Sequence, residues 1–144
     1  MALENYESLC AIHQRIINCQ DKKNKQKYVA NNVDSNDVYL YHFDGEVVKE
    51  GMRCDYLLFN DTKRRLYFVE LKGSDLSYAL KQIDESVRIC KNRFKNEIKQ
   101  YQMSFRVVLN KVRSPKLYTN DTKRFMRNVG SDLKFKSIML EEEI

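Results

Sequence analysis

The sequence predicts an α/β fold built on a mixed sheet, and three observations lead to this prediction. Two apolar runs at residues 53–60 and 65–72 are separated by a polar four-residue loop, which is typical of an antiparallel hairpin. One apolar stripe at helical spacing follows over residues 76–101. A further apolar run at 104–109 comes after the helix, so we expect a helical crossover from the hairpin to a later strand.

The elements before the hairpin are a helix, a loop and a strand. Residues 4–19 carry apolar side chains at helical spacing and predict an amphipathic helix. The stretch from there to about residue 37 is rich in lysine and asparagine and predicts an exposed loop or a short helical turn. Residues 38–43 are aromatic and β-branched, and Asp44-Gly45 follows them, which indicates a strand that ends in a turn.

The second half of the chain begins with the long helix, for which Ser74 is the expected N-cap. A short helix is predicted over residues 120–128, where Gly130 follows as a stop signal. Residues 133–140 predict a last strand before an acidic tail. The expected order is therefore helix, three strands, long helix, strand, short helix and strand.

Length and composition favour one continuous domain over residues 1–144, with a core at about 4–110 and a C-terminal extension at about 111–144. No apolar run approaches the length of a membrane span, and the start lacks a signal-peptide pattern, so we expect a cytoplasmic protein that does not contact the membrane. Four cysteines without a CxxC pair and only two histidines argue against a zinc cluster. Thiols packed as small apolar groups are the simpler interpretation.

The formal charge is +6 and the isoelectric point is about 9.1, which favours an acidic partner such as nucleic acid. Solvated turns would give the same composition, so this indication is weak. The basic residues that we assign to such contacts are Lys22, Lys23, Lys25, Lys63, Arg64 and Arg65.

One charged strand end differs from similar patterns elsewhere in the chain. An acidic residue two positions before a lysine occurs six times, so the pattern alone is background. Only Glu70 and Lys72 stand at the end of an apolar strand and directly before a capped helix. In a strand these two side chains point to the same face, and Leu71 points to the other.

The hairpin register gives Glu70 a partner on the preceding strand. If Asn60 pairs with Arg65, Asp55 lies opposite Glu70, whereas a slip of one residue would put the two on opposite faces. Like charges placed opposite each other destabilise a sheet, and a divalent cation between them removes the conflict. Carboxylate oxygens, with the Leu71 carbonyl as a further ligand, suit Mg²⁺ or Mn²⁺.

This set of residues, in this order of elements, resembles the PD-(D/E)XK nuclease superfamily, which includes restriction endonucleases, Holliday-junction resolvases and RecB-type nucleases. The resemblance covers about residues 4–110. It implies a restriction-endonuclease-like core and a metal-dependent phosphodiesterase site made of Asp55, Glu70 and Lys72. It also implies Mg²⁺ or Mn²⁺ as the cofactor and DNA, more than RNA, as the substrate.

Two further positions match the superfamily in part. Gln82 resembles the helix glutamine of RecB-like members, although a solvated glutamine explains it too, and Ser86 stands where those members usually have a tyrosine. Glu7, or Glu4, would supply the acidic residue of the first helix, and a favourable helix dipole explains either one equally well. The residue before Asp55 is Cys54, where the superfamily has a proline.

Two classes of function follow from this reading. The first is a small metal-dependent nuclease, most simply a DNA endonuclease, which would work as a homodimer if it cuts both strands. The alternative is a catalytically inactive module of the nuclease fold that binds nucleic acid or a protein partner. Two facing carboxylates favour the first class, because an inactive descendant has no reason to keep them.

Overall fold

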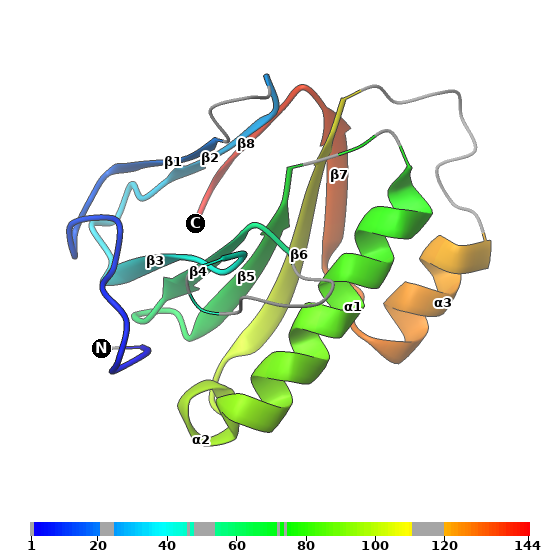
Figure 1. The fold of residues 1–144 in the computed structure, drawn as a ribbon. Helices are drawn as coiled ribbons and strands as arrows, with labels where there is room; N and C mark the ends of the chain where they lie inside the picture. Colours follow the sequence, from blue (N-terminus) through cyan, green and yellow to red (C-terminus); the bar gives the residue numbers. More distant parts are fainter. Residues whose placement is uncertain are drawn as a thin grey trace.

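The computed structural model describes residues 2–20, 25–45, 47, 54–71, 73, 75–110 and 120–144. This part of the chain forms two mixed sheets and three helices (Figure 1), which confirms the α/β class with a mixed sheet. The strands are β1 (Ile16–Gln20), β2 (Lys27–Asn31), β3 (Val38–His42), β4 (Tyr56–Asn60), β5 (Arg65–Glu70), β6 (Gln102–Leu109), β7 (Leu133–Ser137) and β8 (Met139–Glu143). The helices are α1 (Leu76–Arg93), α2 (Lys95–Ile98) and α3 (Asn120–Asn128).

The larger sheet has the strand order β3-β4-β5-β6-β7. The first three strands are antiparallel neighbours, whereas β6 runs parallel to both β5 and β7. The helical crossover from the hairpin to β6 is therefore present as predicted. The hairpin register is also confirmed, because Asn60 pairs with Arg65.

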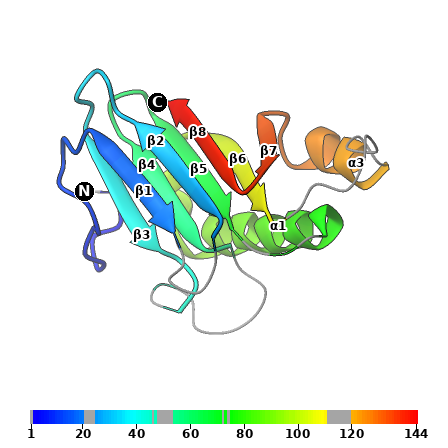
Figure 2. The ribbon, with the colours of Figure 1, turned by 90° about the horizontal axis from the view of Figure 1, so that it is seen from above.

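The smaller sheet, in the order β1-β2-β8, corrects the prediction for the N-terminal part of the chain (Figure 2). Residues 4–19 do not form a helix, and part of the expected loop up to residue 37 is strand β2. Burial along β1 alternates residue by residue, with Ile17 and Cys19 buried between exposed neighbours. This period of two belongs to a strand that is covered on one face.

Hydrogen bonds to a neighbouring strand explain why the helical spacing failed. The Leu9 amide donates to the Leu40 carbonyl at 2.7 Å, and the Val38 amide donates to the Ile12 carbonyl at 2.8 Å. The segment before β1 thus pairs backbone hydrogen-bonding groups with those at the edge of β3. Its apolar side chains gain little burial, since Leu9 is 52% and Ile12 46% exposed.

The two sheets and the helices form three layers, with the larger sheet in the middle (Figures 1 and 2). One face of the larger sheet packs against α1, through residues that include Leu57, Phe59 and Phe68. The other face packs against the smaller sheet, through residues that include Leu58 and Val69. Because both faces are covered, β4 and β5 are almost continuously apolar rather than alternating.

The long helix ends earlier than the apolar stripe predicts. Phe94 has φ −123° and ψ 32°, which interrupts the helix between α1 and α2. Its ring packs edge-on against Tyr6, with ring centroids 6.1 Å apart. At the other end the N-cap is Asp75, which accepts a hydrogen bond from the Tyr78 amide at 3.2 Å. The expected cap, Ser74, lies outside the described residues.

The predicted last strand, 133–140, is two strands that belong to different sheets. The chain turns at Ile138, which has φ 70°, a conformation that β-branched residues rarely adopt. Two backbone hydrogen bonds hold this turn, one from the Ile138 amide to the Leu109 carbonyl and one from the Lys27 amide to the Ile138 carbonyl. The short helix before these strands, α3, has the predicted bounds of 120–128.

Candidate functional site

The two predicted carboxylates lie at the end of the central hairpin. Glu70 is the last residue of β5, and Asp55 directly precedes β4. Glu70 is 0% and Asp55 4% exposed. Burial of a carboxylate is costly unless other groups stabilise it, so this pair needs a physical reason.

Both carboxylates converge on one backbone amide. The Leu71 N–H donates to Asp55 Oδ2 at 2.8 Å and to Glu70 Oε1 at 3.1 Å. An oxygen of each side chain is thus within hydrogen-bond distance of the same nitrogen. The structure therefore brings Asp55 and Glu70 together, as the hairpin register predicts.

The contact differs in detail from the direct cross-strand pair that we expected. The regular ladder ends at the pair Tyr56–Val69. The Asp55 amide donates to the carbonyl of the same Val69, at 3.0 Å. Two consecutive residues therefore oppose one, which is the arrangement of a β-bulge. Bulges re-aim side chains, and here Asp55 reaches the Leu71 amide.

A serine of α1 fixes the chain just before this bulge. Ser86 Oγ accepts from the Cys54 amide at 2.6 Å and donates to the Gln82 carbonyl at 2.7 Å, and the serine is fully buried. Ser86 therefore positions the residue next to Asp55. In the sequence, this serine stands out only as a departure from the superfamily pattern. The signal in the sequence was a hydroxyl residue directly beside the apolar stripe of the helix.

Gly73 lies in the chain between the acid pair and α1. Gly73 has φ 91°, which favours glycine, and its carbonyl accepts from the Asn110 amide at 2.9 Å. This bond joins Gly73 to the end of β6. The carboxyl ends of the neighbouring strands β5 and β6 thus lie beside the acid pair, at the edge where open α/β sheets bind ligands.

The other predicted site residues are less well placed. Lys72 lies outside the described residues. Gln82 is half-buried on α1. Glu7 and Glu4 are exposed on a segment that is not helical, so the helix-dipole explanation for them no longer applies. Within the described parts of the chain, no group of three or more His, Cys, Asp or Glu side chains is placed to hold a metal, so neither glutamate completes such a group with the acid pair.

The basic turn of the hairpin lies at the end opposite the acid pair. The six residues of β5 separate the two ends by about 20 Å. The three cations of this turn also have acidic neighbours: Lys63 with Asp34 at 3.6 Å, Arg64 with Asp61 at 2.8 Å and Arg65 with Asp132 at 3.1 Å. Of the other cations assigned to nucleic acid, Lys25 is exposed, and Lys22 and Lys23 lie outside the described residues.

The cysteines are packed thiols, as we interpreted them. All four are free, and Cys19, Cys54 and Cys90 are buried. Burial raises the pKa of the Cys54 thiol well above its usual value and that of Cys90 to about 12. Cys54 adjoins Asp55, but the thiolate needed for a nucleophile is suppressed there.

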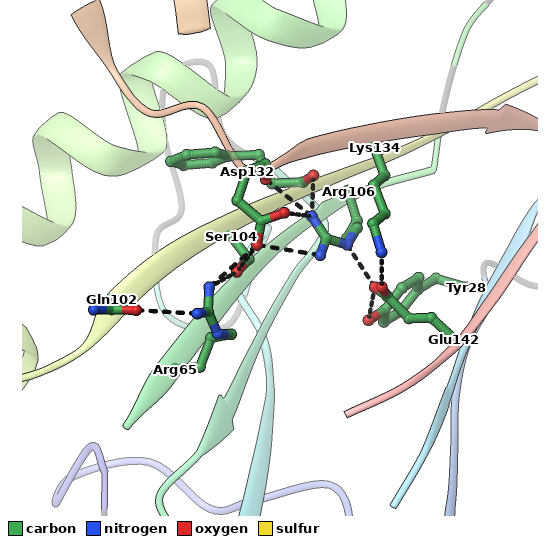
Figure 3. A network of polar contacts seen from close by, with 9 residues as sticks. Tyr28, Arg65, Gln102, Ser104, Arg106, Asp132, Lys134 and Glu142 are labelled. Carbon is green, nitrogen blue, oxygen red and sulfur yellow. Dashed lines mark hydrogen bonds and ion pairs between the residues drawn. The ribbon is translucent and has the colours of Figure 1, made fainter. Parts of the chain in front are cut away.

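An ion network that the sequence patterns do not predict joins the two sheets (Figure 3). Arg106 of β6 is 3% exposed, and it donates to Glu142 of β8 at 2.5 Å and to Asp132 at 3.2 Å. Tyr28 of β2 also donates to Glu142, at 2.7 Å. A single arginine within the apolar run of β6 was the signal in the sequence, since a buried guanidinium requires acidic partners.

Electrostatics keep the two acids of this network ionised. Burial alone would raise the pKa of Glu142, but hydrogen bonds from Arg106 and Tyr28 outweigh it and bring the pKa below its ordinary value. For Asp132, burial is likewise outweighed by hydrogen bonds from Ser104 and Arg106. The network therefore stabilises the contact between the sheets and is distinct from the acid pair.

Comparisons with known proteins add no assignment: no family model, curated protein or solved structure matches the chain. Among the described residues, no helix is long and apolar enough to span a membrane.

Proposed function

We propose that the protein is a metal-dependent phosphodiesterase that cleaves nucleic acid, with DNA as the substrate and RNA as the alternative within the same class. The observation that carries this proposal is the convergence of Asp55 and Glu70 on the Leu71 amide. Two buried carboxylates, one at the end of β5 and one directly before β4, make a site suited to a cation that binds a phosphate.

The donor set fits Mg²⁺ or Mn²⁺. Mg²⁺ typically keeps several waters and binds one or two protein carboxylates together with substrate phosphates. Asp55 and Glu70 would provide the carboxylates, and the Leu71 carbonyl would provide a further oxygen. When bound, the cation would supply an acidified water and neutralise charge on the transition state.

The surrounding residues would hold this site in shape. Ser86 anchors the chain before Asp55, and the Leu71 amide orients one oxygen of each carboxylate. Lys72 is proposed to orient the attacking water or to stabilise the developing negative charge. Gln82 is proposed to contact the metal-bound water or the nucleic acid.

An inactive module of the nuclease fold is the second candidate. It is favoured by the Leu71 amide itself, because hydrogen bonds to this amide give both carboxylates a structural role that requires no metal. In that case the chain would bind nucleic acid or a protein partner without cleavage. The two candidates differ in one measurable property, which is metal-dependent hydrolysis.

The deciding experiment is a cleavage assay on supercoiled, linear and branched DNA and on RNA, with Mg²⁺, Mn²⁺ or EDTA. Asp55→Asn and Glu70→Gln keep the shape of each side chain and an oxygen that can accept from Leu71, but they remove the charge. Asp84→Asn and Glu97→Gln make the same chemical changes at exposed positions and serve as controls. We expect cleavage that EDTA abolishes and that each site variant lowers by about 100-fold or more, whereas the controls retain it.

Full cleavage by both site variants would show that the activity has another origin. Absence of cleavage by the unmodified protein on every substrate would favour the inactive module. A homodimer belongs to the proposal only for cleavage of both strands, and light scattering on the purified protein would measure its mass.

A further inference from the structure

A second feature suited to an anionic ligand lies at the C-terminal end of α1. The last turn of α1, together with α2 and the start of β6, surrounds a groove of about 800 Å³, within the size range of ligand sites. We call it the lysine groove. Three lysines and three apolar residues define it: Lys91, Lys95, Lys99, Ile98, Met103 and Val129.

The charge of the lysine groove has a single sign. No aspartate or glutamate is among its described lining residues. Lys91, Lys95 and Lys99 are exposed, and none of them forms an ion pair with another described residue. The acidic residue of α2, Glu97, lines a separate hollow beside Asp61. This segregation contrasts with the basic hairpin turn, where each cation has an acidic neighbour.

The groove also offers groups that suit nucleobases. The half-buried side chains of Tyr101, Met103 and Val129 provide surface for base faces, and the side-chain amides of Asn92 and Gln102 can bond with base edges. Arg65 donates to the Gln102 side-chain oxygen at 3.0 Å, which fixes the orientation of that amide. Phosphates along a positively charged groove, with a base against an aromatic side chain such as Tyr101, are the usual plan of a single-strand site.

We propose that the lysine groove binds a single-stranded segment of nucleic acid through its phosphates. The site is separate from the acid pair, because none of the described residues that line the groove belongs to the pair, and Lys91 lies about 7.5 Å further along α1 than Ser86, which contacts the residue before Asp55. A hollow between α1 and α3 shares Val129 with the groove and extends to Ser77 in the first turn of α1. Only the choice of nucleic acid as the ligand rests on the proposed function, since binding at the groove does not require cleavage.

The test is the salt dependence of binding to a fluorescent single strand of about 16 nucleotides, DNA or RNA, measured in EDTA. EDTA separates the two proposals, since a protein without nuclease activity can still bind and an active nuclease can lack this groove site. The variant is Lys95→Gln with Lys99→Gln. The control is Lys123→Gln with Lys136→Gln, which changes the net charge equally at exposed positions outside the groove.

Each phosphate contact contributes about 0.7 to the slope of log affinity against log salt for a single strand. Loss of two contacts should therefore reduce the slope by about 1.4 and weaken binding about 25-fold at 0.1 M salt. The control variant should keep the slope of the unmodified protein. Circular dichroism confirms that each variant remains folded.

Three results would overturn the proposal. One is an unchanged slope in the groove variant, which would show that these lysines only stabilise the C-terminal ends of the helices through the helix dipole. Another is an equal loss in the control variant, which would indicate a diffuse effect of net charge. The third is that polyglutamate of matched length binds as tightly and loses its binding in the groove variant, which would indicate an acidic protein partner.

Discussion

Arg106→Met tests the ion network that joins the two sheets. It removes a guanidinium that is 3% exposed and keeps most of the length of the side chain. Removing one partner of a buried ion pair destabilises proteins by about 3–5 kcal/mol, because the other charge stays buried. Here Glu142 retains Tyr28 and Lys134, at 2.7 and 3.0 Å. We therefore expect the lower end of the range, about 3 kcal/mol.

The free energy of unfolding, obtained from urea titrations followed by circular dichroism, measures this loss. At roughly 3 °C per kcal/mol for a chain of this size, the melting temperature should fall by about 9 °C. Arg88→Met is the matched control, because Arg88 pairs with Glu85 on the exposed side of α1, and its transition midpoint should not change. If Arg106→Met is as stable as Arg88→Met, the network does not join the sheets in the way described.

The remaining predictions concern pH, the anchor of Asp55 and the turn at Ile138. Because the folded-state pKa of Glu142 is lowered, its contribution to stability is complete above its ordinary pKa of 4.5 and is lost as the pH falls through the lower folded value. Acid titrations should show a smaller loss in Glu142→Gln. Ser86→Ala leaves the buried Cys54 amide without its acceptor, so urea titrations should show a loss of about 1–3 kcal/mol. Ile138→Asn relieves a left-handed conformation, so calorimetry should show a gain of about 1 kcal/mol.

The local patterns of the sequence were sufficient to predict the central elements of the fold. The polar loop fixed the hairpin register, the apolar stripe located α1, an apolar run located β6, and the stop signal at Gly130 located α3. The prediction for the N-terminal part was wrong because apolar residues occur there at both the helical and the strand period. Leu9, Ile12 and Ile16 are spaced as in a helix, whereas Ile17 and Cys19 follow the period of a strand. Only long-range pairing of β2 with β8 decides between the two.

The candidate site was predictable only as far as the register. Residue spacing brought Asp55 next to Glu70, but it contained no information on the bulge or on the shared Leu71 amide. The contact of Ser86 with the Cys54 amide depends on how α1 lies across the hairpin. The lysine groove depends on the break at Phe94 and on the return of the chain past Gly130, which neighbouring residues in the sequence do not specify.

The central claim is that Asp55 and Glu70 together hold one divalent cation. Calorimetric titration with Mn²⁺, in the absence of nucleic acid, tests it most directly. We predict one site per chain in the unmodified protein, with affinity reduced at least about 10-fold by Glu70→Gln and by Asp55→Asn. Bound Mn²⁺ should also raise the free energy of unfolding, by about 1.4 kcal/mol when the free Mn²⁺ concentration is ten times its Kd. Binding of equal strength in the two variants and in Glu97→Gln would contradict the claim.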